Sequence, residues 1–448
     1  MLCMILALAV SGCANLEGAD SPLAANAPRV FEVANYGAKG DGVTDDGPAI
    51  TSAVNAAIRA GGGTVKFPCG QYALLSVAGS VPGGRSILYF KDATNVTLQG
   101  QGSCSHLFTK LTQKSVIEFE NSTYISVHSL LISAPNVPYV ERYGMDGGSA
   151  VRYTGVTYGS ISEIEVDGAT AGAIYMTKGS NNISVTSNNV HDTYGSAVWE
   201  DDCGAANAIN CNPSTPSFSN DYESNAFTNT SLDMGASIQF DNGSHASNST
   251  ARHNTISWNR QPVPNPANPG VHCIQVNNAS GVNVLNNTCA GTPWDAIVVT
   301  TGAGGQCRNV TITGNIMLRS GTGTGGGSGI VVYDAVGGRG ISNLTIESNS
   351  VHTASDDGIR LFAASQQGNV QQATIENNII KMTDQRHPGS RFGIDVEYSN
   401  AINITANNIT CNGKCIAAGV NINSSTLSSP SATANTVTDI LGKPLVVQ

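Results

Sequence analysis

Three aspartates and a histidine stand directly before short apolar segments that are typical of strands. They are His272 before Cys-Ile-Gln-Val, Asp295 before Ala-Ile-Val-Val, and Asp356 and Asp357 before Gly-Ile-Arg-Leu. Strands stacked about 4.8 Å apart would set Asp295 and Asp357 roughly 9–10 Å apart, two strands away from each other. Inverting glycosidases hold their two carboxyl groups roughly 6.5–9.5 Å apart. The pattern favours hydrolysis of a glycosidic bond, in which one aspartate donates a proton and the other activates water.

The same residues also have a purely structural interpretation, because aspartate before a strand is common turn chemistry. His272 would lie one strand from Asp295 and could hydrogen-bond to it. Trp294 offers a ring face for a sugar, and Arg360 offers a positive charge for an anion or a substrate. Both alternatives for the aspartates stay open at this point.

A second group with similar potential lies earlier in the chain. Asp201 and Asp241 would stack about 5 Å apart, which would raise the pKa of one carboxyl. Such a pair could act as acid and nucleophile or hold Ca²⁺. Exposed residues beside this pair could bind a glycan, because aromatic rings stack on sugars and side-chain amides bond to hydroxyl groups. The alternative is an ordinary solvated sheet face, since Tyr and Trp are common in strands. The candidate substrate-binding residues on this strip are Tyr175, Trp199, Gln239 and Gln275.

A repeated asparagine predicts the framework that positions these groups. Each copy follows a segment of alternating apolar residues, which indicates a strand with one buried face. Asparagine tolerates the left-handed conformation and bonds to backbone, so it predicts a turn. Self-similarity at about thirty residues indicates a solenoid. This predicted asparagine ladder comprises Asn188, Asn225, Asn254, Asn287, Asn315, Asn349, Asn378 and Asn408.

Each ladder asparagine is followed by a strand of the pattern small–apolar–X–apolar, in which X and the residue two later face outward. The first outward column comprises Arg152, Tyr175, Trp199, Gln239, Gln275, Val298, Val331, Arg360, Asp395 and Asn421. The second outward column comprises Thr154, Thr177, Asp201, Asp241, Asn277, Thr300, Tyr333, Phe362, Glu397 and Asn423. Insertions beside these columns predict the walls of a binding groove. They are Pro135–Ser149, Asp202–Ser219, Asn259–Gly270, Ser320–Ser328 and Thr383–Arg391.

The composition narrows the possible partners. Only 12% of the 448 residues are charged, and the formal net charge is −10. A nucleic-acid partner normally leaves a basic footprint, so we expect none. The charge also gives no help in binding a polyanion unless a local basic patch or Ca²⁺ does so. No Cys or His cluster has zinc-ligand spacing, so we assign no metal.

Residues 1–20 have the character of an export segment, because their apolar run is too short to span a bilayer. The run ends in Val-Ser-Gly-Cys13, which resembles a bacterial lipobox with Cys13 as the lipidated residue; the alternative is an ordinary cleaved signal peptide. Both predict an exported protein, and the lipobox alternative adds a lipid anchor at Cys13 as its one contact with a membrane. Export permits disulfides. The candidate pairs are Cys69–Cys104, Cys203–Cys211 and Cys411–Cys415, with at least one cysteine of an odd set left over.

Residues 31–72 carry the most specific motif. Phe-Glu-Val-Ala-Asn-Tyr-Gly-Ala-Lys-Gly-Asp-Gly-Val-Thr-Asp-Asp precedes a short amphipathic helix and then Gly-Gly-Gly-Thr-Val-Lys-Phe-Pro. Asp45 or Asp46 supplies an N-cap, and such a helix can cover the open end of a solenoid core. This segment resembles the rhamnogalacturonase/epimerase type of the pectin-lyase-like superfamily. The resemblance implies an all-β, right-handed parallel β-helix of about ten or more coils, with residues 21–448 as a single domain.

The coils are also similar to those of polygalacturonases, and the Asp356-Asp357 element matches that family's Asp-Asp element. The family's other elements are missing in their proper forms, and His272 precedes the acids rather than following them. We therefore expect an exported, polysaccharide-active enzyme, first an inverting glycoside hydrolase that requires no cofactor. A Ca²⁺-dependent lyase or C5-epimerase is the second expectation, and a non-catalytic glycan-binding adhesin is the third. Substrate, oligomeric state and cleavage pattern are left open.

Overall fold

The computed structural model describes residues 29–77, 84–135, 137, 148–202, 216–232, 235–259, 270–302, 304–323, 326–364, 370–382, 392–410, 418–423, 425, 434–438 and 443–447. The predicted export segment with Cys13 lies outside the described residues. So do the predicted pairs Cys203–Cys211 and Cys411–Cys415 and most of the predicted insertions.

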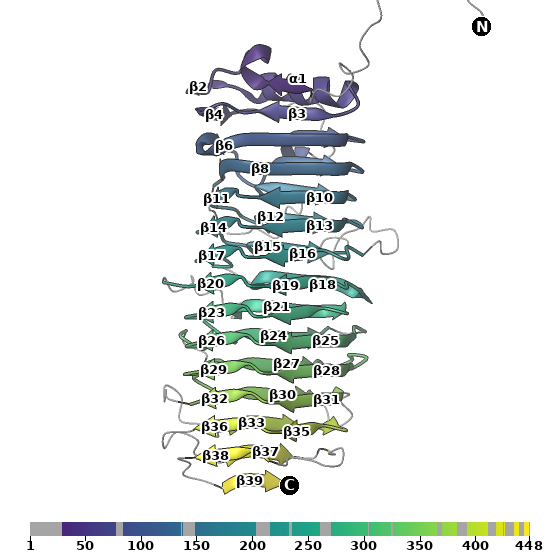
Figure 1. Cartoon of the computed structure of the whole chain (residues 1–448), viewed down its shortest axis with the longest axis vertical. Coiled ribbons are helices and arrows are strands. Elements are labelled where there is room, and N and C mark those ends of the chain that lie inside the picture. The colour runs from purple at the N-terminus through teal and green to yellow at the C-terminus, as the bar shows by residue number, and fades with distance from the viewer. Residues whose placement is uncertain are drawn as a thin grey trace, which may run out of the picture.

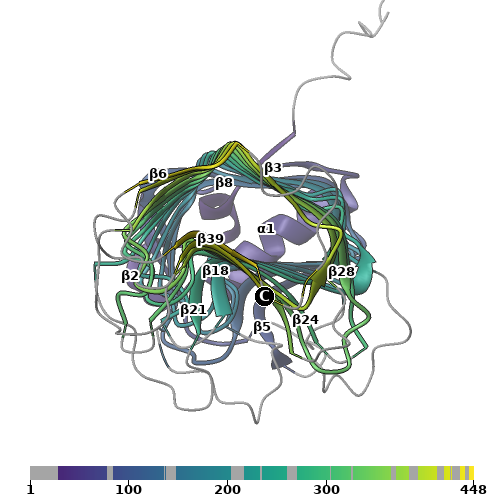
Figure 2. The same ribbon diagram turned by 90° about the horizontal axis from the view of Figure 1, so that it is seen from below.

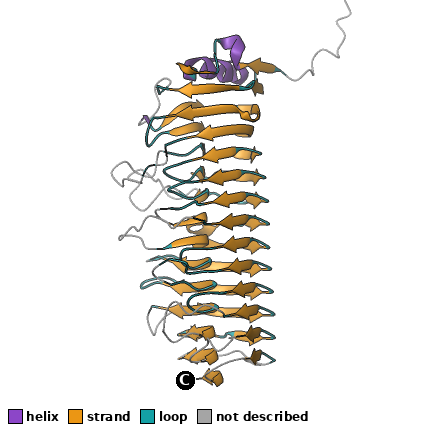
Figure 3. Ribbon diagram, turned by 90° about the vertical axis from the view of Figure 1, so that its left-hand side faces the viewer, coloured by secondary structure: helices purple, strands orange, loops and turns teal. Residues whose placement is uncertain are grey.

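The chain winds into a right-handed parallel β-helix in which coils stack along one long axis (Figures 1 and 3). Two sheets of parallel strands run the length of the stack, one of 13 strands and one of 26. Seen along the axis, the coils superpose around a common interior (Figure 2). The predicted fold class is therefore confirmed.

The 13-stranded sheet contributes one strand to each coil and includes the ten outward strands that the sequence predicts between Arg152 and Asn423. They are β5 (Ser86–Lys91), β7 (Ser115–Glu120), β9 (Val151–Thr154), β12 (Ile174–Thr177), β15 (Val198–Asp201), β18 (Gly235–Ala246), β21 (Val271–Ser280), β24 (Ile297–Thr301), β27 (Ile330–Asp334), β30 (Ile359–Ala363), β33 (Phe392–Glu397), β37 (Ala418–Asn423) and β39 (Lys443–Val447).

The 26-stranded sheet contributes most often two strands to a coil, one before and one directly after the ladder asparagine. They are β1 (Val30–Glu32), β2 (Asp41–Asp45), β3 (Gly63–Lys66), β4 (Gly70–Leu74), β6 (Thr94–Thr109), β8 (Thr123–Ser133), β10 (Thr157–Ser162), β11 (Glu165–Asp167), β13 (Asn181–Thr186), β14 (Asn189–His191), β16 (Asp221–Glu223), β17 (Ala226–Thr228), β19 (Thr250–Arg252), β20 (Thr255–Ser257), β22 (Asn283–Leu285), β23 (Thr288–Ala290), β25 (Cys307–Thr313), β26 (Ile316–Leu318), β28 (Ile341–Glu347), β29 (Ser350–His352), β31 (Val370–Glu376), β32 (Ile379–Lys381), β34 (Ser399–Asn400), β35 (Asn403–Thr405), β36 (Asn408–Thr410) and β38 (Thr436–Thr438).

The short strand directly after the asparagine was not predicted as a separate element. Three residues with a single buried side chain, as in β26 or β29, are too short to show an alternating pattern in the sequence. The core is filled by alternate residues of all three strands, mostly Ile, Val and Leu with little or no exposure. Such side chains suit pleated strands and supply the apolar burial that stabilises the stack.

The asparagine ladder runs through the buried corner between the two strand rows. The Oδ1 of Asn315 accepts hydrogen bonds from the backbone N–H of Asn287, at 2.9 Å, and from its Nδ2, at 3.0 Å. The Nδ2 of Asn315 donates in turn to Val284 O, at 2.8 Å, and to Asn349 Oδ1, at 3.0 Å. Repetition of this unit satisfies backbone groups that a buried corner would otherwise leave unpaired.

Two details of the predicted ladder are wrong. The last predicted member, Asn408, is exposed, and Asn407 takes its place and bonds onward to Asn435. The ladder asparagines also do not adopt the left-handed conformation. The residue before each of them does, as Ala406 does at φ 55°, and this αL residue makes the bend. The asparagine then extends into the next strand with its amide turned inward.

The N-terminal end of the core is covered by helix α1 (Gly47–Arg59), which follows the short 3₁₀ helix η2 (Val33–Tyr36) (Figure 1). Ile50 and Val54 of this helix are fully buried, as the predicted amphipathic pattern requires. Asp46 occupies the N-cap position, but its carboxylate accepts the N–H groups of Lys39, at 2.6 Å, and Gly40, at 3.1 Å, instead of capping the helix. These acids hold turns, which agrees with the structural role expected for them.

The disulfide Cys69–Cys104 is present as predicted. A second disulfide, Cys273–Cys289, joins β21 to β23 through the buried interior and was not predicted. Cys307 is buried and unpaired, as expected for an odd set. Within the described ranges, no helix is long and apolar enough to cross a membrane.

Candidate functional site

The strand pairing of the 13-stranded sheet reproduces the first predicted outward column in full and the second from Asp201 to Phe362. Arg152, Tyr175, Trp199, Gln239, Gln275, Val298, Val331, Arg360, Asp395 and Asn421 are successive partners in the first column. The second column pairs Asp201 with Asp241 and then runs through Asn277, Thr300, Tyr333 and Phe362. Parallel coils in constant register therefore bring side chains about thirty residues apart into one outward face.

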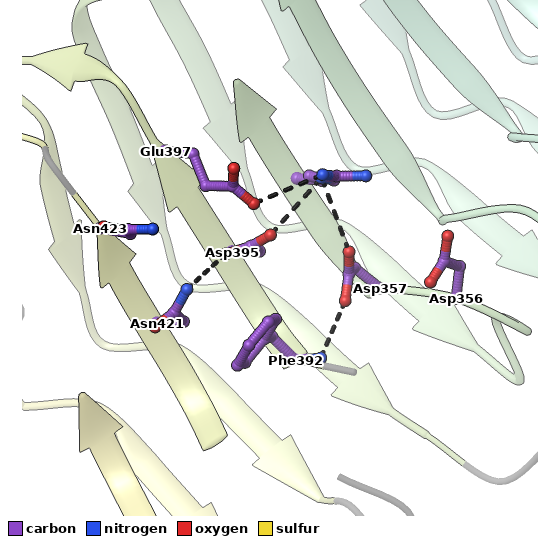
Figure 4. A pocket seen from close by; sticks show the side chains of 8 residues that line it. Asp356, Asp357, Phe392, Asp395, Glu397, Asn421 and Asn423 are labelled. Carbon is purple, nitrogen blue, oxygen red and sulfur yellow. Dashed lines mark hydrogen bonds and ion pairs between the residues drawn. The ribbon is translucent and has the colours of Figure 1, made fainter. Parts of the chain in front are cut away.

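A pocket of about 330 Å³ opens on this face where β30, β33 and β37 lie side by side (Figure 4). The pocket contains two of the predicted catalytic residues together with acids that the sequence analysis did not choose. It is lined by Asp356, Asp357, Arg360, Phe392, Asp395, Glu397, Asn421 and Asn423.

Asp357 stands at the start of β30 with a side chain that is only 4% exposed. Its Oδ1 accepts the backbone N–H of Phe392 on the next coil, at 2.8 Å, while its Oδ2 lies 3.9 Å from Arg360 Nε. Burial raises the pKa of Asp357 well above its usual range, and the charges of Asp356 and Asp395 raise it further. The Asp357 carboxyl therefore holds a proton at a pH where an ordinary aspartate is ionised.

Asp295 occupies the matching position two coils earlier. Its Oδ1 accepts the N–H of Ser328 on the next coil, at 2.7 Å, and its Oδ2 lies 3.8 Å from His272 Nδ1. Burial and then the charge of Asp356 raise the pKa of Asp295 to about 7, and burial lowers the pKa of His272 to about 4. The predicted neighbourhood of His272 and Asp295 is confirmed, although the closer contact of His272 Nδ1 is with the Asp295 backbone oxygen, at 3.2 Å.

Arg360 lies at the centre of the pocket among three carboxylates. Its Nε is 3.4 Å from Asp395 Oδ2 and 3.9 Å from Asp357 Oδ2, and its Nη2 is 3.4 Å from Glu397 Oε1. Burial raises the pKa of Asp395 to about 7, while the Nδ2 of Asn421 donates to its Oδ1 at 2.8 Å. Since both are measured from the same Arg360 Nε, the Asp357 and Asp395 oxygens are at most about 7.3 Å apart.

An aromatic pair borders the arginine. The rings of Tyr333 and Phe362 stack with centroids 4.5 Å apart and planes inclined by 27°. The Arg360 guanidinium lies 4.3 Å from the centroid of the Phe362 ring. Both rings are partly exposed on the outward face, so they offer apolar contact to a ligand in the pocket.

The second predicted group is assembled but mostly covered. Tyr175 is fully buried and Trp199 is 6% exposed, so neither presents the open ring face expected of a sugar platform. Tyr175 donates its hydroxyl to Asp201 Oδ2 at 2.8 Å, and Arg152 lies over the Tyr175 ring at 4.8 Å. Burial and the charge of Asp202 raise the pKa of Asp241 to about 6. This group is a buried polar network more than an open site.

The remaining predicted contacts are partly exposed. Gln239 and Gln275 lie on the first outward column, and Trp294 lies beside Asp295. On the opposite sheet, Asp167, His191 and Asp192 bring potential metal-ligand atoms within 4.8 Å of one another, but the ion pairs of His191 account for this cluster, and we assign no metal to it.

Sequence reasoning missed Asp395, Glu397, Tyr333 and Phe362 as site residues. All four were already in the predicted outward columns, so their stacking on Arg360 and Asp357 was the available signal. The first outward column predicts that Asp395 lies beside Arg360, but it does not show that the Asp395 side chain is only 2% exposed.

Comparisons with known proteins agree with this architecture. The family described as rhamnogalacturonase A/epimerase, pectate lyase-like, matches residues 30–235, and the right-handed β-helix region matches residues 267–440. Mannuronan C5-epimerase AlgE1 of Azotobacter vinelandii is 45% identical over 75 residues, which is 17% of this chain and 5% of that protein. The chain thus matches only about one twentieth of the length of this relative.

Solved structures show the same fold. The catalytic unit of the GH87 α-1,3-glucanase from Streptomyces thermodiastaticus aligns with a TM-score of 0.58 and 18% identity, over 93% of this chain and 68% of that one. A tailspike protein mutant of E. coli bacteriophage HK620, in complex with a pentasaccharide, aligns with a TM-score of 0.59 and 13% identity, over 92% and 78% of the two chains. The chain belongs to the pectin-lyase-like superfamily of right-handed parallel β-helix proteins.

Proposed function

We propose that the protein is a polysaccharide-active enzyme that hydrolyses a glycosidic bond at the pocket around Arg360. The observation that carries this proposal is the set of buried carboxyl groups with raised pKa values on adjacent coils. Strongly perturbed titratable groups in a cleft favour a catalytic role. Fold analogy adds only that glycan-active proteins share this architecture.

Asp357 is the proton donor in this mechanism, because burial and the neighbouring acids raise the pKa of its carboxyl well above the usual range and its Oδ1 is fixed by the Phe392 N–H. Asp395 is the opposing base, held toward its ionised form by Arg360 and Asn421. A pKa of about 7 suits a general base near neutral pH. Their Oδ2 atoms are at most about 7.3 Å apart, a bound that admits the lower part of the range of roughly 6.5–9.5 Å of inverting enzymes and also the roughly 5–5.5 Å of retaining ones.

Asp295, which the sequence pairs with Asp357 as proton donor and base, is the alternative to Asp395 in this mechanism. It also binds a proton up to a pH of about 7, and the Asp356 charge acts on both aspartates. No step of this mechanism uses a cofactor. The two disulfides, Cys69–Cys104 and Cys273–Cys289, suit a protein exported to an oxidising compartment, as the N-terminal segment predicts.

The second candidate function is a uronate lyase or C5-epimerase that would use Ca²⁺. It is favoured by the short sequence matches to AlgE1 and to alginate lyase 7 of the same bacterium, 44% identical over 72 residues. Those matches cover 5% and 8% of the relatives, so they carry less weight than the carboxyl groups of this chain.

Digestion of a panel of polysaccharides separates these functions. The hydrolase produces new reducing ends without absorbance from an unsaturated uronate. A lyase produces both signals, and an epimerase changes the uronate composition without changing chain length. Binding of a glycan with no chemical change would instead indicate a non-catalytic adhesin and would contradict the proposed hydrolase.

A further inference from the structure

We propose that the glycan held at the Arg360 pocket is uncharged, so that the natural substrate is a neutral polysaccharide and not a polyuronate. This inference rests on the proposed function, because it names the substrate class of the same site. It is carried by the excess of acidic over basic side chains in the pocket and by the ion pairs that Arg152 and Arg360, the described arginines of the outward columns, form with carboxylates.

The pocket itself has an excess of negative groups. Its lining contains four carboxyl groups, from Asp356, Asp357, Asp395 and Glu397, against one guanidinium. Arg360 contacts Asp395 and Glu397 at 3.4 Å each and lies on the Phe362 ring. A uronate carboxylate would have to displace one of these partners and would then face the remaining acids. Repulsion between the uronate carboxylate and these acids would weaken its binding.

The N-terminal part of the outward face shows the same arrangement. Arg152 is 1% exposed and its Nε lies 3.4 Å from Glu118 Oε1. Arg85 binds Glu118 at 2.8 Å and Glu120 at 2.9 Å. A polyuronate carries a charge on every sugar, so it would need further cations along the face, and these arginines are already paired.

The segment 383–391 precedes Phe392 and lies outside the described residues. Its sequence contains Arg386 and Arg391 against Asp384, which is a formal excess of one positive charge. That excess is smaller than the deficit of the pocket, and the whole chain has a net charge of −10. The formal charge count over the pocket lining and residues 383–391 taken together is therefore still negative.

Groups that recognise hydroxyls are present in place of free cations. A protonated carboxyl can donate to a hydroxyl oxygen, ionised carboxylates accept from hydroxyl groups, and Tyr333 and Phe362 provide ring contact. A neutral glycan satisfies these donors and acceptors without bringing a charge that the pocket would have to compensate.

The test uses matched pairs of polymers, each polyuronate beside its carboxyl-reduced form, which differs only in bearing CH₂OH for the carboxylate. Binding to the full chain is measured by calorimetry in EDTA, so that no divalent cation bridges the acids. We expect at least one reduced polymer to bind about tenfold or more tightly than its parent. Tighter binding of a polyuronate, or no binding of any neutral member of the panel, would overturn the inference.

The double variant Asp395→Asn/Glu397→Gln frees Arg360 from two negative partners. It should narrow the preference for the reduced polymer about fivefold or more, because a uronate then meets a less compensated guanidinium. Glu347→Gln, on the opposite sheet, is the matched control and should leave the ratio unchanged. A ratio that is the same in the double variant and in the wild type would also overturn the inference.

Cleavage is scored separately from binding in the same samples. Binding of a neutral polymer without cleavage would refute the hydrolase and leave the substrate inference standing. Hydrolysis of a polyuronate in EDTA, in preference to its reduced form, would refute the inference and leave the hydrolase standing.

Discussion

Asp295 and Asp357 use their two carboxylate oxygens in the same way. One oxygen accepts a backbone N–H from the next coil, from Ser328 or Phe392, and the other faces a basic side chain, His272 or Arg360. The first contact is the turn chemistry that competes with a catalytic interpretation. The oxygen that faces the basic side chain lies 3.8 Å from His272 or 3.9 Å from Arg360, too far for a hydrogen bond, so it can still contact a substrate. The same aspartate can therefore hold a turn and take part in catalysis.

The assignment of Asp395 as base predicts the pH profile. A base acts in its ionised form, and burial raises the pKa of Asp395 to about 7, so kcat/KM should rise as the pH increases through about 7. Initial rates measured from pH 5 to 9 test this directly. Asp395→Asn should lower kcat by about 100-fold or more. A profile that falls between pH 6 and 8 would be inconsistent with Asp395 as the base.

Burial of the aromatic residues predicts which of them bind glycan. Phe362→Ala removes a ring beside Arg360 and should weaken glycan binding about tenfold, as loss of one good contact does. Tyr175→Phe should leave binding unchanged, because Tyr175 is fully buried and donates its hydroxyl to Asp201. The measurement is the affinity of both variants for the same oligosaccharide. A larger loss of affinity in Tyr175→Phe than in Phe362→Ala would indicate that glycan binds at the group around Tyr175 and Asp201 instead.

A proton held by Asp295 affects stability as well as chemistry. Its pKa is raised from 3.8 to about 7, so its favourable contribution to stability is fully present below about pH 4 and is lost as the pH rises through about 7. Asp295→Asn should therefore gain stability over the wild type at pH 8 but not at pH 4. The gain has an upper bound of roughly 4 kcal/mol, at 1.36 kcal/mol for each pH unit.

Urea unfolding at pH 4 and pH 8 measures this difference. The control is Asp167→Asn, since the Asp167 side chain is 56% exposed. A gain for Asp295→Asn that is equal at the two pH values would show that Asp295 does not take up a proton in the folded protein.

At the scale of elements, the asparagine ladder and the strands around it set the position of every site residue. Asn407 bonds to Asn378 and Asn435 inside the corner, whereas its neighbour Asn408 is exposed in β36. The two adjacent residues form a natural pair for comparison. Their difference isolates the hydrogen bonds of the ladder from the intrinsic preference of asparagine for turns.

Asn407→Ala should reduce the free energy of unfolding by about 3 kcal/mol, because the N–H and Nδ2 of Asn378 and the oxygen of Ile375 lose their bonds to the Asn407 side chain, while the Asn435 Oδ1 keeps only the backbone N–H of residue 407. Asn408→Ala should change it by less than about 0.5 kcal/mol. Chemical denaturation of both variants provides the measurement. Equal effects would contradict the correction of the ladder from Asn408 to Asn407.

The sequence predicts the strands, the columns and the neighbourhood of His272 and Asp295 because strand alternation and a constant repeat fix which side chains share a face. It misplaces the last ladder member, since two adjacent asparagines fit the same spacing and only the αL position of Ala406 separates them. It does not reveal the Cys273–Cys289 pair, which depends on how β21 and β23 face each other across a coil. It also does not reveal that Tyr175 and Trp199 are covered, because alternation gives the direction of a side chain and not what lies over it.

At the scale of the whole molecule, the coil stack places an anionic pocket near its C-terminal end and a covered polar network toward its N-terminal half (Figures 1 and 4). Strand pairing holds both in register on one sheet, β12 to β18 for the network and β30 to β37 for the pocket. The proposed catalytic site therefore lies only at the C-terminal end of this face, on β30 to β37. A single substitution in this pocket is therefore enough to test whether the site is catalytic.

The most direct test is the rate at which reducing ends form from the best glycan of the panel, measured for the wild type, Asp357→Asn and the control Asp167→Asn. Circular dichroism and thermal unfolding confirm that the variants are folded, since asparagine keeps an oxygen for the Phe392 N–H. The account predicts that Asp357→Asn lowers kcat by about 100-fold or more while Asp167→Asn stays within about twofold of the wild type. Equal rates for Asp357→Asn and the wild type would contradict it.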